Sequence, residues 1–272
     1  MKTLWQDGYF TTPDNLRLFY RLHGPETARH LLIILHGFGE HAGRYEKFSN
    51  YFPDIQIAIC DMRGMGLSEG DRAHITNFDQ YESDALEFIA FISRQCQNKT
   101  PILLGHSLGG LLLMQLHLRH QVQAARFIFS APCFRVAIPQ FAFTFNKIVS
   151  RFNPRFTYHN PVYYRNLTHD CEEMKSYQSD GLILRKMTAG LLSEMIRAGG
   201  EIEQKKHLDF DVPVHFLLAG KDKLIRTDVA KDVFEKISSP YKTIKIYDNF
   251  FHEIFNESEQ KLPFTDLSKF IC

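Results

Sequence analysis

Short apolar runs alternate with longer amphipathic segments along most of the chain, and this alternation limits the possible folds more than any other feature. Within each run the apolar residues are consecutive, which is typical of parallel strands buried on both faces. The amphipathic segments between them supply the helical crossovers that parallel strands require. The sequence therefore predicts an α/β fold with a mostly parallel central sheet flanked by helices. The predicted strands are Leu31–Leu35, Ile55–Cys60, Ile102–Leu104, Phe127–Phe129, Val214–Ala219 and Ile244–Tyr247.

The chain is expected to begin with a β-hairpin. Leu16–Leu22 has the composition of a strand, and residues 13–15 before it, Pro-Asp-Asn, suit a turn after a short strand near Tyr9 and Phe10. Helical periodicity predicts four helices, at Arg44–Phe52, Phe78–Cys96, Leu108–His120 and Val229–Ile237. The second helix carries an apolar stripe that we expect to face the core, formed by Tyr81, Ala85, Phe88 and Ile92.

The alternation stops between residues 133 and 205, where helical or irregular segments replace the strand-like runs. We interpret residues 133–205 as a mainly helical cap inserted into a core made of residues 1–132 and 206–272. A chain of 272 residues is long enough to bury one such core.

Composition narrows the class of protein. The 32 basic residues nearly cancel the 31 acidic ones, so no overall field favours nucleic acid. Residues 1–7 lack the apolar core of a secretory signal, and no run approaches 18 apolar residues. The five dispersed cysteines form no C-x-x-C pair and are interpreted as free thiols in a reducing compartment. We therefore expect a cytoplasmic protein, with no prediction of its oligomeric state.

The pentapeptide GHSLG at residues 105–109 fits the G-x-S-x-G pattern of a nucleophilic serine. A chance match in a surface loop is the alternative, but here a predicted strand precedes the motif and a predicted helix follows it. That context places Ser107 in the strained turn of a strand-to-helix elbow, where Gly105 and Gly109 let the backbones pass closely. Ser107 is the predicted nucleophile.

A serine hydroxyl is a weak nucleophile, so it needs a base and an orienting acid, which in this type of fold follow in the order Ser, Asp, His. Asp222 comes after the predicted strand Val214–Ala219, and His252 comes after the last predicted strand. The carboxyl ends of parallel strands meet at one edge of a sheet. We therefore predict Ser107, Asp222 and His252 as a catalytic triad. Two other aspartates are less favoured as the acid, because Asp248 is too near His252 in sequence and Asp211 precedes its strand.

An oxyanion hole requires two convergent N–H donors. The first is expected to be the backbone N–H of Leu108, directly after the nucleophile. The second is expected from the loop HGFG at residues 36–39, with Phe38 as the predicted donor. The two glycines of this loop also suit a plain tight turn, and such a turn exposes the N–H, so the two interpretations agree.

The segments HGFGEHAGRY at 36–45 and DMRGMGLSEG at 61–70, together with the elbow, Asp222 and His252, resemble the monoacylglycerol lipase and lysophospholipase group of the serine α/β-hydrolases. The resemblance runs from about residue 16 to the end and is weakest in the cap. It implies an α/β-hydrolase fold, a cap over an acyl-chain tunnel, a lipid-like ester substrate, and no metal or organic cofactor.

The resemblance also implies residues at the polar, head-group end of the site. By position these are Glu40, Arg44, His106 and Tyr177. Animal members carry a second histidine three residues after the catalytic one, whereas this chain has Phe255 there. An identical glycerol site is therefore not implied. Glu40 and Arg44 alternatively form only an i,i+4 pair near a helix start.

The first part of the predicted cap, Cys133–Arg165, contains nine aromatic and five basic residues and no Asp or Glu. Its phenylalanines are expected to line an acyl tunnel or to contact a membrane surface transiently, in preference to ordinary packing with a solvated basic rim. Interleaved basic and aromatic residues also permit nucleic-acid binding, which the intact triad argues against. The phenylalanines in question are Phe141, Phe143, Phe145, Phe152 and Phe156.

The sequence thus predicts a serine hydrolase that cleaves the ester of a monoacylglycerol or lysophospholipid through an acyl-enzyme, releasing a fatty acid. A carboxylesterase or thioesterase acting on smaller acyl groups stays open, because it differs in the cap and not in the triad. A non-catalytic binding protein of the same fold is disfavoured, since damage at a triad position is then expected and none is present.

Overall fold

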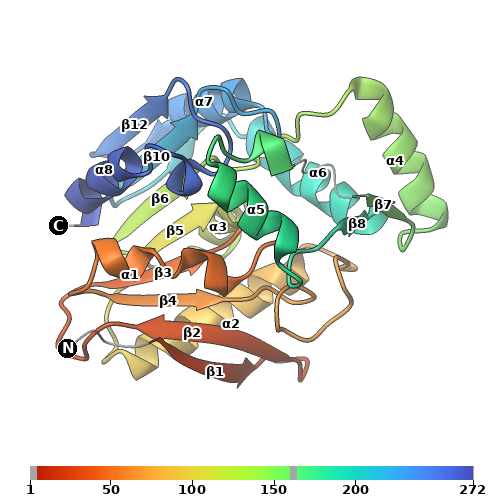
Figure 1. Ribbon diagram of the computed structural model, residues 1–272. Coiled ribbons are helices and arrows are strands. Elements are labelled where there is room, and N and C mark those ends of the chain that lie inside the picture. The colour runs from red at the N-terminus through yellow and green to blue at the C-terminus, as the bar shows by residue number, and fades with distance from the viewer. Residues whose placement is uncertain (1–4, 160–163, 272) are drawn as a thin grey trace.

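The computed structural model describes residues 5–159 and 164–271, and its centre is an eight-stranded sheet (Figure 1). The strand order is β1-β2-β4-β3-β5-β6-β10-β12, in which only β2 pairs antiparallel with its neighbours, so the predicted hairpin and mostly parallel sheet are confirmed. The strands are β1 (Gln6–Thr11), β2 (Arg17–His23), β3 (Leu31–Leu35), β4 (Gln56–Cys60), β5 (Ile102–His106), β6 (Arg126–Ser130), β10 (Val214–Ala219) and β12 (Lys242–Tyr247).

Both faces of the sheet are covered, and strand β3 shows how. Its five residues are all buried; Leu31, Ile33 and Leu35 join one apolar core, whereas Leu32 and Ile34 join a second core on the other side. Because successive side chains of a strand point to opposite faces, a strand between two cores must be apolar at every position. This is the physical origin of the continuous apolar runs.

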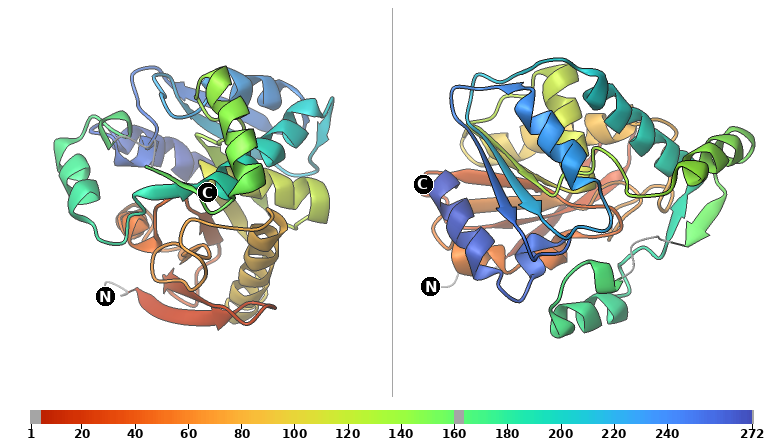
Figure 2. Two further views of the ribbon diagram at one scale, coloured as in Figure 1. Left: turned by 90° about the vertical axis from the view of Figure 1, so that its right-hand side faces the viewer. Right: turned by 90° about the horizontal axis from the view of Figure 1, so that it is seen from above.

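Helices form a layer on each face of the sheet (Figure 2). Helices α2 (Asp79–Gln95), α3 (Leu108–His120) and α7 (Thr227–Glu235) contribute to the first core, and α1 (Phe48–Tyr51) and α8 (Lys261–Ile271) to the second. The predicted stripe on α2 is confirmed, since all four of its residues are buried. Because helices pack on both faces of the sheet, the carboxyl ends of its strands are held in place, and so are the starts of the loops that follow them.

Two predicted helices differ from the observed ones. The segment predicted as one helix over Arg44–Phe52 is a 3-10 turn, η1 (Ala42–Tyr45), followed by the short α1. The helix predicted to end at Ile237 ends at Glu235, and Ile237–Ser238 is strand β11, which pairs with β9 (Leu208–Asp209). A two-residue strand is too short to show a periodicity, so the sequence pattern could not separate it from the helix.

The segment of residues 133–205 covers the end of the sheet remote from α8 (Figures 1 and 2). It contains α4 (Gln140–Phe152), η2 (Tyr164–Asn166), α5 (Cys171–Ser179) and α6 (Ala189–Gln204). It also contains a small antiparallel ribbon of β7 (Thr157–His159) and β8 (Lys186–Thr188), where the sequence predicted no strand. The two strands of three residues lie far apart in the chain, so no local pattern marked them.

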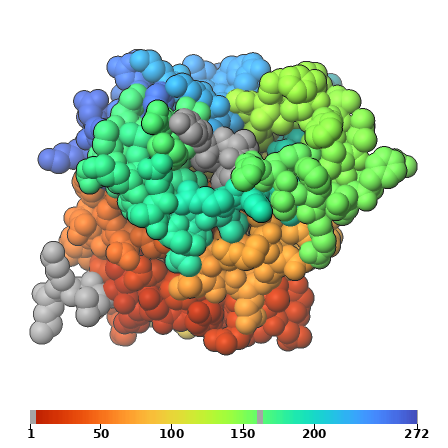
Figure 3. Space-filling model, turned by 45° about the vertical axis from the view of Figure 1, so that its right-hand side comes forward, coloured from red at the N-terminus to blue at the C-terminus, as the bar shows by residue number. Residues whose placement is uncertain are grey.

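Helix α6 joins this segment to the core. Gln115 Nε2 on α3 donates a hydrogen bond to the carbonyl of Ala198, 2.8 Å away. A Cβ at Gly199 would lie 2.0 Å from the carbonyl oxygen of Phe134, so only glycine allows this close approach. Helix α4 packs on α6 and protrudes at the edge of the molecule (Figure 3). The predicted domain boundaries at 133 and 205 stay a prediction.

Candidate active site

Ser107 lies at a sharp turn between the end of β5 and the start of α3. Its φ of 52° and ψ of −114° are a strained combination for a residue with a side chain. A Cβ at Gly105 would lie 2.4 Å from the carbonyl oxygen of Gly109, and one at Gly109 would lie 2.0 Å from that of Leu35. Glycine is therefore required on both sides of the turn. The structure gives GHSLG the strand-to-helix setting that the sequence predicted.

Asp222 and His252 are brought together from the loops after β10 and β12. His252 Nδ1 lies 2.6 Å from Asp222 Oδ2, and both side chains are buried. The other oxygen of Asp222 accepts the backbone N–H groups of Leu224 at 2.8 Å and Ile225 at 3.1 Å. The carboxylate is thus fixed in orientation, and it accepts the Nδ1 proton of the ring, which leaves Nε2 as the basic atom.

The electrostatic setting of His252 suits a general base. Burial disfavours the charged ring, but the negative charge of Asp222 and its hydrogen bond outweigh burial, so the pKa of His252 is raised above its ordinary value. A neutral imidazole with a raised pKa is a stronger proton acceptor. The contact with Asp222 therefore has the electrostatic effect expected of a carboxylate beside a histidine base.

Ser107 and His252 line the same cavity. Its polar lining residues include Ser107, His252 and Glu40, and most of the remaining wall is apolar. Much of that wall comes from residues 133–205 and from the loop after β10. The apolar wall includes Val136, Ile138, Leu192, Met195, Leu224 and Ile225. The arrangement fits a substrate with a reactive polar group at one end and an aliphatic body.

Cys133 also lines this cavity, close to the nucleophile, since its backbone N–H donates to the carbonyl of Ser107 at 3.0 Å. Burial and the charge of Asp222 raise the pKa of the Cys133 thiol to about 12. A thiol is a nucleophile only as the thiolate. Cys133 is therefore inert at neutral pH, and Ser107 is the nucleophile that the geometry favours.

The predicted oxyanion loop is anchored by His36. His36 Nε2 accepts the backbone N–H of Met62 at 2.9 Å, so the proton is on Nδ1, which donates to the carbonyl of Gly37 at 2.7 Å. Within the described chain, no residue accepts a hydrogen bond from the N–H of Phe38 or of Leu108. Phe38 lines the cavity beside Ser107. Both predicted donors are free to act, and their role stays a prediction.

The head-group candidates Glu40 and Arg44 form a buried cluster with Glu253, a residue that the sequence analysis missed. Arg44 Nη2 donates to Glu253 Oε2, whereas Arg44 Nε lies 3.7 Å from Glu40 Oε2. Asn256 Nδ2 donates to Glu253 at 2.8 Å. Arg44 is therefore more than an i,i+4 partner of Glu40. A charged residue directly after His252 in an apolar stretch was the sequence signal for Glu253.

Electrostatics separates the two carboxyl groups of this cluster. Burial and the charge of Glu253 raise the pKa of Glu40. Burial alone would raise the pKa of Glu253 too, but the charge of Arg44 and the hydrogen bond from Asn256 hold it below its ordinary value. Glu253 is therefore the carboxylate that neutralises Arg44. Glu40 lines the cavity with Ser107, and its charge is less well compensated because Arg44 is farther from it.

His106 lies beside His252, with ring centroids 5.0 Å apart. Its Nδ1 contacts the carbonyl and hydroxyl oxygens of Ser130 at 3.1 Å, and burial, aided by His252, lowers the pKa of His106 to about 3. The ring is therefore neutral. His106, Arg44 and Phe255 line a second, smaller cavity of about 250 Å³ that also contacts Glu40. The four head-group candidates thus do not share one wall.

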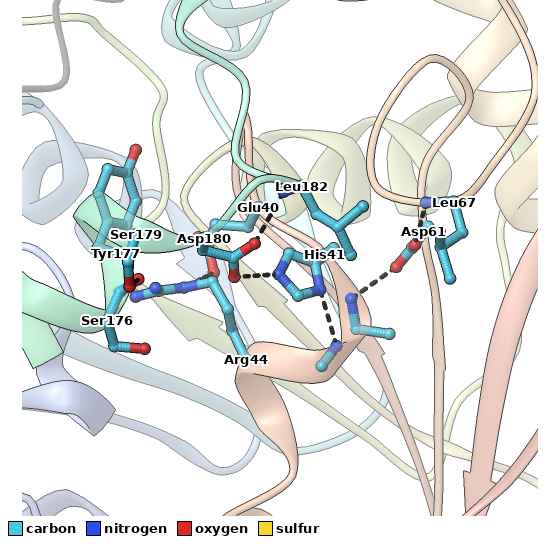
Figure 4. Close-up of polar contacts among 12 residues, drawn as sticks. Glu40, His41, Arg44, Asp61, Leu67, Ser176, Tyr177, Ser179, Asp180 and Leu182 are labelled. Atoms are coloured by element: carbon cyan, nitrogen blue, oxygen red, sulfur yellow. Dashed lines mark hydrogen bonds and ion pairs between the residues drawn. The ribbon is translucent and has the colours of Figure 1, made fainter.

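Tyr177 connects the head-group candidates to residues 133–205. It is buried, lines the larger cavity, and packs its ring against the guanidinium of Arg44, 4.9 Å from the ring centroid. Nearby, His41 Nε2 donates to Asp180 Oδ2 at 2.7 Å while its Nδ1 accepts the N–H of Gly43 (Figure 4). The HGFGEHAGRY segment therefore contacts α5 and the turn after it at two points.

Of the two roles expected for the cap phenylalanines, the structure contradicts the first, lining the tunnel, and leaves membrane contact a prediction. None of the five lines the cavity, and four of them are exposed on or beside α4, with Phe141 at 76% and Phe152 at 81%. Only Phe143 is half-buried. The reason is that α4 turns its polar Asn146 toward α6, where Asn146 Nδ2 donates to Ser193 at 2.8 Å, so its aromatic side faces outward.

Neither a metal site nor a membrane span is found in the part of the chain that the structure describes. No group of three or more His, Cys, Asp or Glu side chains there is arranged to hold a metal ion. No helix in residues 5–159 and 164–271 is both long and apolar enough to cross a bilayer.

The chain is similar to characterised lipid hydrolases along most of its length. The monoacylglycerol lipase of Mycolicibacterium smegmatis is 25% identical over 268 residues, covering 96% of this chain and 95% of that protein. Phospholipase YtpA of Bacillus subtilis is 24% identical over 237 residues, covering 85% of this chain and 90% of that one.

A solved structure of a soluble variant of monoglyceride lipase from Saccharomyces cerevisiae, in complex with a substrate analog, has a TM-score of 0.88 at 18% identity and covers 99% of this chain and 94% of that chain. This likeness confirms the predicted α/β-hydrolase fold. The profile of the family described as Serine aminopeptidase, S33 matches residues 26–259, which is most of the chain. The chain belongs to this family of α/β-hydrolases, and its resemblance to the monoacylglycerol lipase and lysophospholipase group is confirmed.

Proposed function

We propose that the chain hydrolyses the carboxylic ester of a monoacylglycerol or lysophospholipid through an acyl-enzyme on Ser107. The observation that carries the proposal is that Ser107 and His252 line the same cavity, whose wall is largely apolar. A nucleophile at the end of an apolar cavity suits an ester whose acyl chain fills the cavity. The names of the M. smegmatis and B. subtilis relatives support a lipid substrate.

The proposed reaction has two steps. His252 Nε2 takes the proton of Ser107 as its oxygen attacks the ester carbonyl, and Asp222 stabilises the charged ring. The tetrahedral intermediate collapses as His252 returns the proton to the departing alcohol, leaving the acyl group on Ser107. A water molecule, deprotonated by His252, then releases the fatty acid. The N–H groups of Phe38 and Leu108 hold the oxyanion in both steps.

The polar side of the site is proposed to bind the alcohol portion of the substrate. Glu40 and Tyr177 line the reactive cavity, whereas Arg44 and His106 line the smaller cavity, which Glu40 also lines. Buried atoms of this group, Arg44 Nε and His106 Nε2, have no hydrogen-bond partner within the described residues. The carboxyl group of Glu40 and the hydroxyl group of Tyr177, which do line the reactive cavity, favour a hydroxylated alcohol over an apolar one.

Residues 133–205 are proposed to act as the cap that selects the substrate and contacts a membrane surface. Phe141, Phe145 and Phe152 are exposed on α4, and the flanking Lys147 and Arg151 give the surface a positive charge. An aromatic and basic helix face suits an anionic lipid surface. The protein would then be cytoplasmic and peripheral to a membrane.

The experiment that tests the function measures product release from a substrate panel by the wild-type chain and Ser107→Ala. The panel contains monoacylglycerols, lysophosphatidylcholines, short p-nitrophenyl esters and an aminoacyl p-nitroanilide. We expect fatty acid from the first two, abolished in the variant. The control, Ser268→Ala, changes a serine on α8 that lines neither cavity and bonds only the carbonyl of Thr265, and it is expected to stay active.

Each outcome of the panel is informative. Preference for short esters would contradict the lipid substrate and leave the esterase alternative. Cleavage of the anilide alone would contradict ester hydrolysis and favour the activity that the family description names. Equal turnover by wild type and Ser107→Ala would contradict the triad.

A further inference from the structure

Glu257 is a buried carboxylate that joins two segments far apart in the sequence. Its Oε1 accepts the backbone N–H of Phe251 at 2.7 Å and lies 2.9 Å from Nδ1 of His169. Its Oε2 accepts the backbone N–H of His169 at 2.9 Å. A carboxylate only accepts hydrogen bonds, so the His169 ring is the donor in its contact. One side chain therefore ties the backbone at His169 to the residue directly before His252.

The residue directly after His252 is tied to the same segment. The backbone N–H of Glu253 donates to the carbonyl of Leu167 at 2.8 Å. Thr168 Oγ1 donates to the carbonyl of Asn256 at 2.7 Å, and the ring of Phe251 stacks on that of His169 with centroids 3.8 Å apart. The backbone N–H groups on both sides of His252 are therefore connected to residues 167–169. The N–H of Glu253 reaches Leu167 directly, and the N–H of Phe251 is linked through the carboxylate of Glu257.

We propose that Glu257 is a positioning residue, which sets the place of His252 by holding Phe251 and His169 together. This inference rests on the proposed function, in which His252 is the base. Glu257 lines neither cavity, so it does not reach the substrate. Asp222 orients the ring of His252, but the backbone on either side decides where the ring lies. Displacing a catalytic group by about 1 Å costs on the order of 100-fold in rate.

The variant Glu257→Gln tests this role. Glutamine keeps the length of the side chain, but its amide nitrogen cannot accept a hydrogen bond, so one of the two bonded oxygens is lost. We expect kcat for a soluble p-nitrophenyl ester, divided by active sites titrated with a fluorophosphonate, to fall about 10- to 100-fold. KM is expected to stay within about threefold, since the cavity wall is intact. The inflection of kcat/KM with pH is expected to shift downward as His252 loosens from Asp222.

Glu82→Gln is the matched control. Glu82 is an equally buried carboxylate that bonds Arg119 Nη1 at 2.8 Å and His120 Nε2 at 2.6 Å, and it lines neither cavity. We expect Glu82→Gln to lower Tm without changing kcat per titrated site. Glu257→Gln with wild-type kcat and pH profile, whatever its Tm, would overturn the inference and show a structural role alone.

A second variant covers the case in which Glu257→Gln does not fold. Thr168→Val keeps the shape of the side chain and removes the hydroxyl that donates to Asn256, lies 3.4 Å from Glu257 Oε2 and accepts the N–H of Asp170. It therefore loosens residues 167–169 while the Glu257 side chain keeps its bonds to Phe251 and His169. We expect kcat to fall about three- to tenfold; a folded Thr168→Val with unchanged kcat contradicts the inference. Failure of the proposed function is recognised separately, because the wild-type chain would then release no product that depends on Ser107.

Discussion

Side chains at the carboxyl edge of the sheet are buried and hydrogen-bonded, whereas the aromatic side chains of helix α4 are exposed. At the sheet edge, the side chains of Asp222 and His252 are buried and bonded to each other, and Asp222 also accepts backbone N–H groups. On α4, Phe141 and Phe152 are largely exposed and the side facing α6 is polar. The comparison teaches that chemistry and substrate access are separate in this chain. We therefore expect the reaction rate to depend on contacts that the core fixes, and the surface of α4 to affect only where the protein meets its substrate.

The largest expected effect lies at the sheet edge. His252→Ala removes the base, and Asp222→Asn leaves the ring in the wrong tautomer, so kcat is expected to fall about 10⁶-fold and about 10⁴-fold, respectively. Steady-state kinetics with a p-nitrophenyl ester measures both. Asp248→Asn is the control, because Asp248 lies in the same loop as His252 but is exposed. An equal loss of kcat in Asp248→Asn would contradict the assignment of Asp222 as the acid.

The next effect concerns the buried pair that links the HGFGEHAGRY segment to the His252 loop. Arg44→Met leaves the carboxylate of Glu253 buried without a counter-charge, so the free energy of unfolding is expected to fall by about 3–5 kcal/mol. Urea denaturation measures it. Arg226→Met breaks the exposed pair with Asp228 and is expected to leave the urea midpoint unchanged. Similar losses of unfolding free energy in Arg44→Met and Arg226→Met would show that burial of an ion pair does not decide its contribution to stability here.

The pH dependence follows from the raised pKa of His252. Only the neutral ring accepts a proton, so kcat/KM is expected to fall as pH drops, with an inflection above the ordinary value of 6.5. Asp222→Asn removes the raising charge and is expected to move the inflection downward. By linkage, a raised pKa stabilises the fold most below pH 6.5, and this contribution is lost as pH rises through the folded-state value. An inflection below 6.5 in the wild type would contradict the geometry at Asp222.

The smallest effect on catalysis is expected on α4. The double variant Phe141→Ser and Phe152→Ser should leave kcat for a soluble ester within about twofold, because neither side chain lines the cavity. Its affinity for vesicles of anionic lipid is expected to fall at least about tenfold, since each phenylalanine loses its apolar burial in lipid. Tyr241→Ser, exposed elsewhere on the surface, is the control in a vesicle sedimentation assay. Unchanged affinity would contradict membrane contact through α4.

The core could be predicted from sequence because its signals are local. Strand β3 shows a continuous apolar run because both its faces are buried, and GHSLG is recognisable because a strand and a helix flank it. The positions of Asp222 and His252 follow from the rule that strand ends meet at one edge. These inferences needed no knowledge of distant contacts.

The remaining contacts could not be predicted because they join distant residues without a periodic pattern. Glu257 meets His169 across 88 positions, and Arg44 meets Glu253 across 209. The outward direction of Phe141 depends on Asn146 packing toward α6, which composition does not reveal. Sequence therefore gave the chemistry at the sheet edge more fully than the arrangement of residues 133–205.

The most direct test of the account identifies the residue that carries the acyl group. The wild-type chain is quenched with acid within its first turnovers on a long-chain p-nitrophenyl ester, digested, and mapped by mass spectrometry, with Ser107→Ala as the control. The account predicts one acyl adduct, on the peptide that contains Ser107, and none in the control. An adduct on Cys133 instead, or steady turnover with no adduct at Ser107, would contradict it.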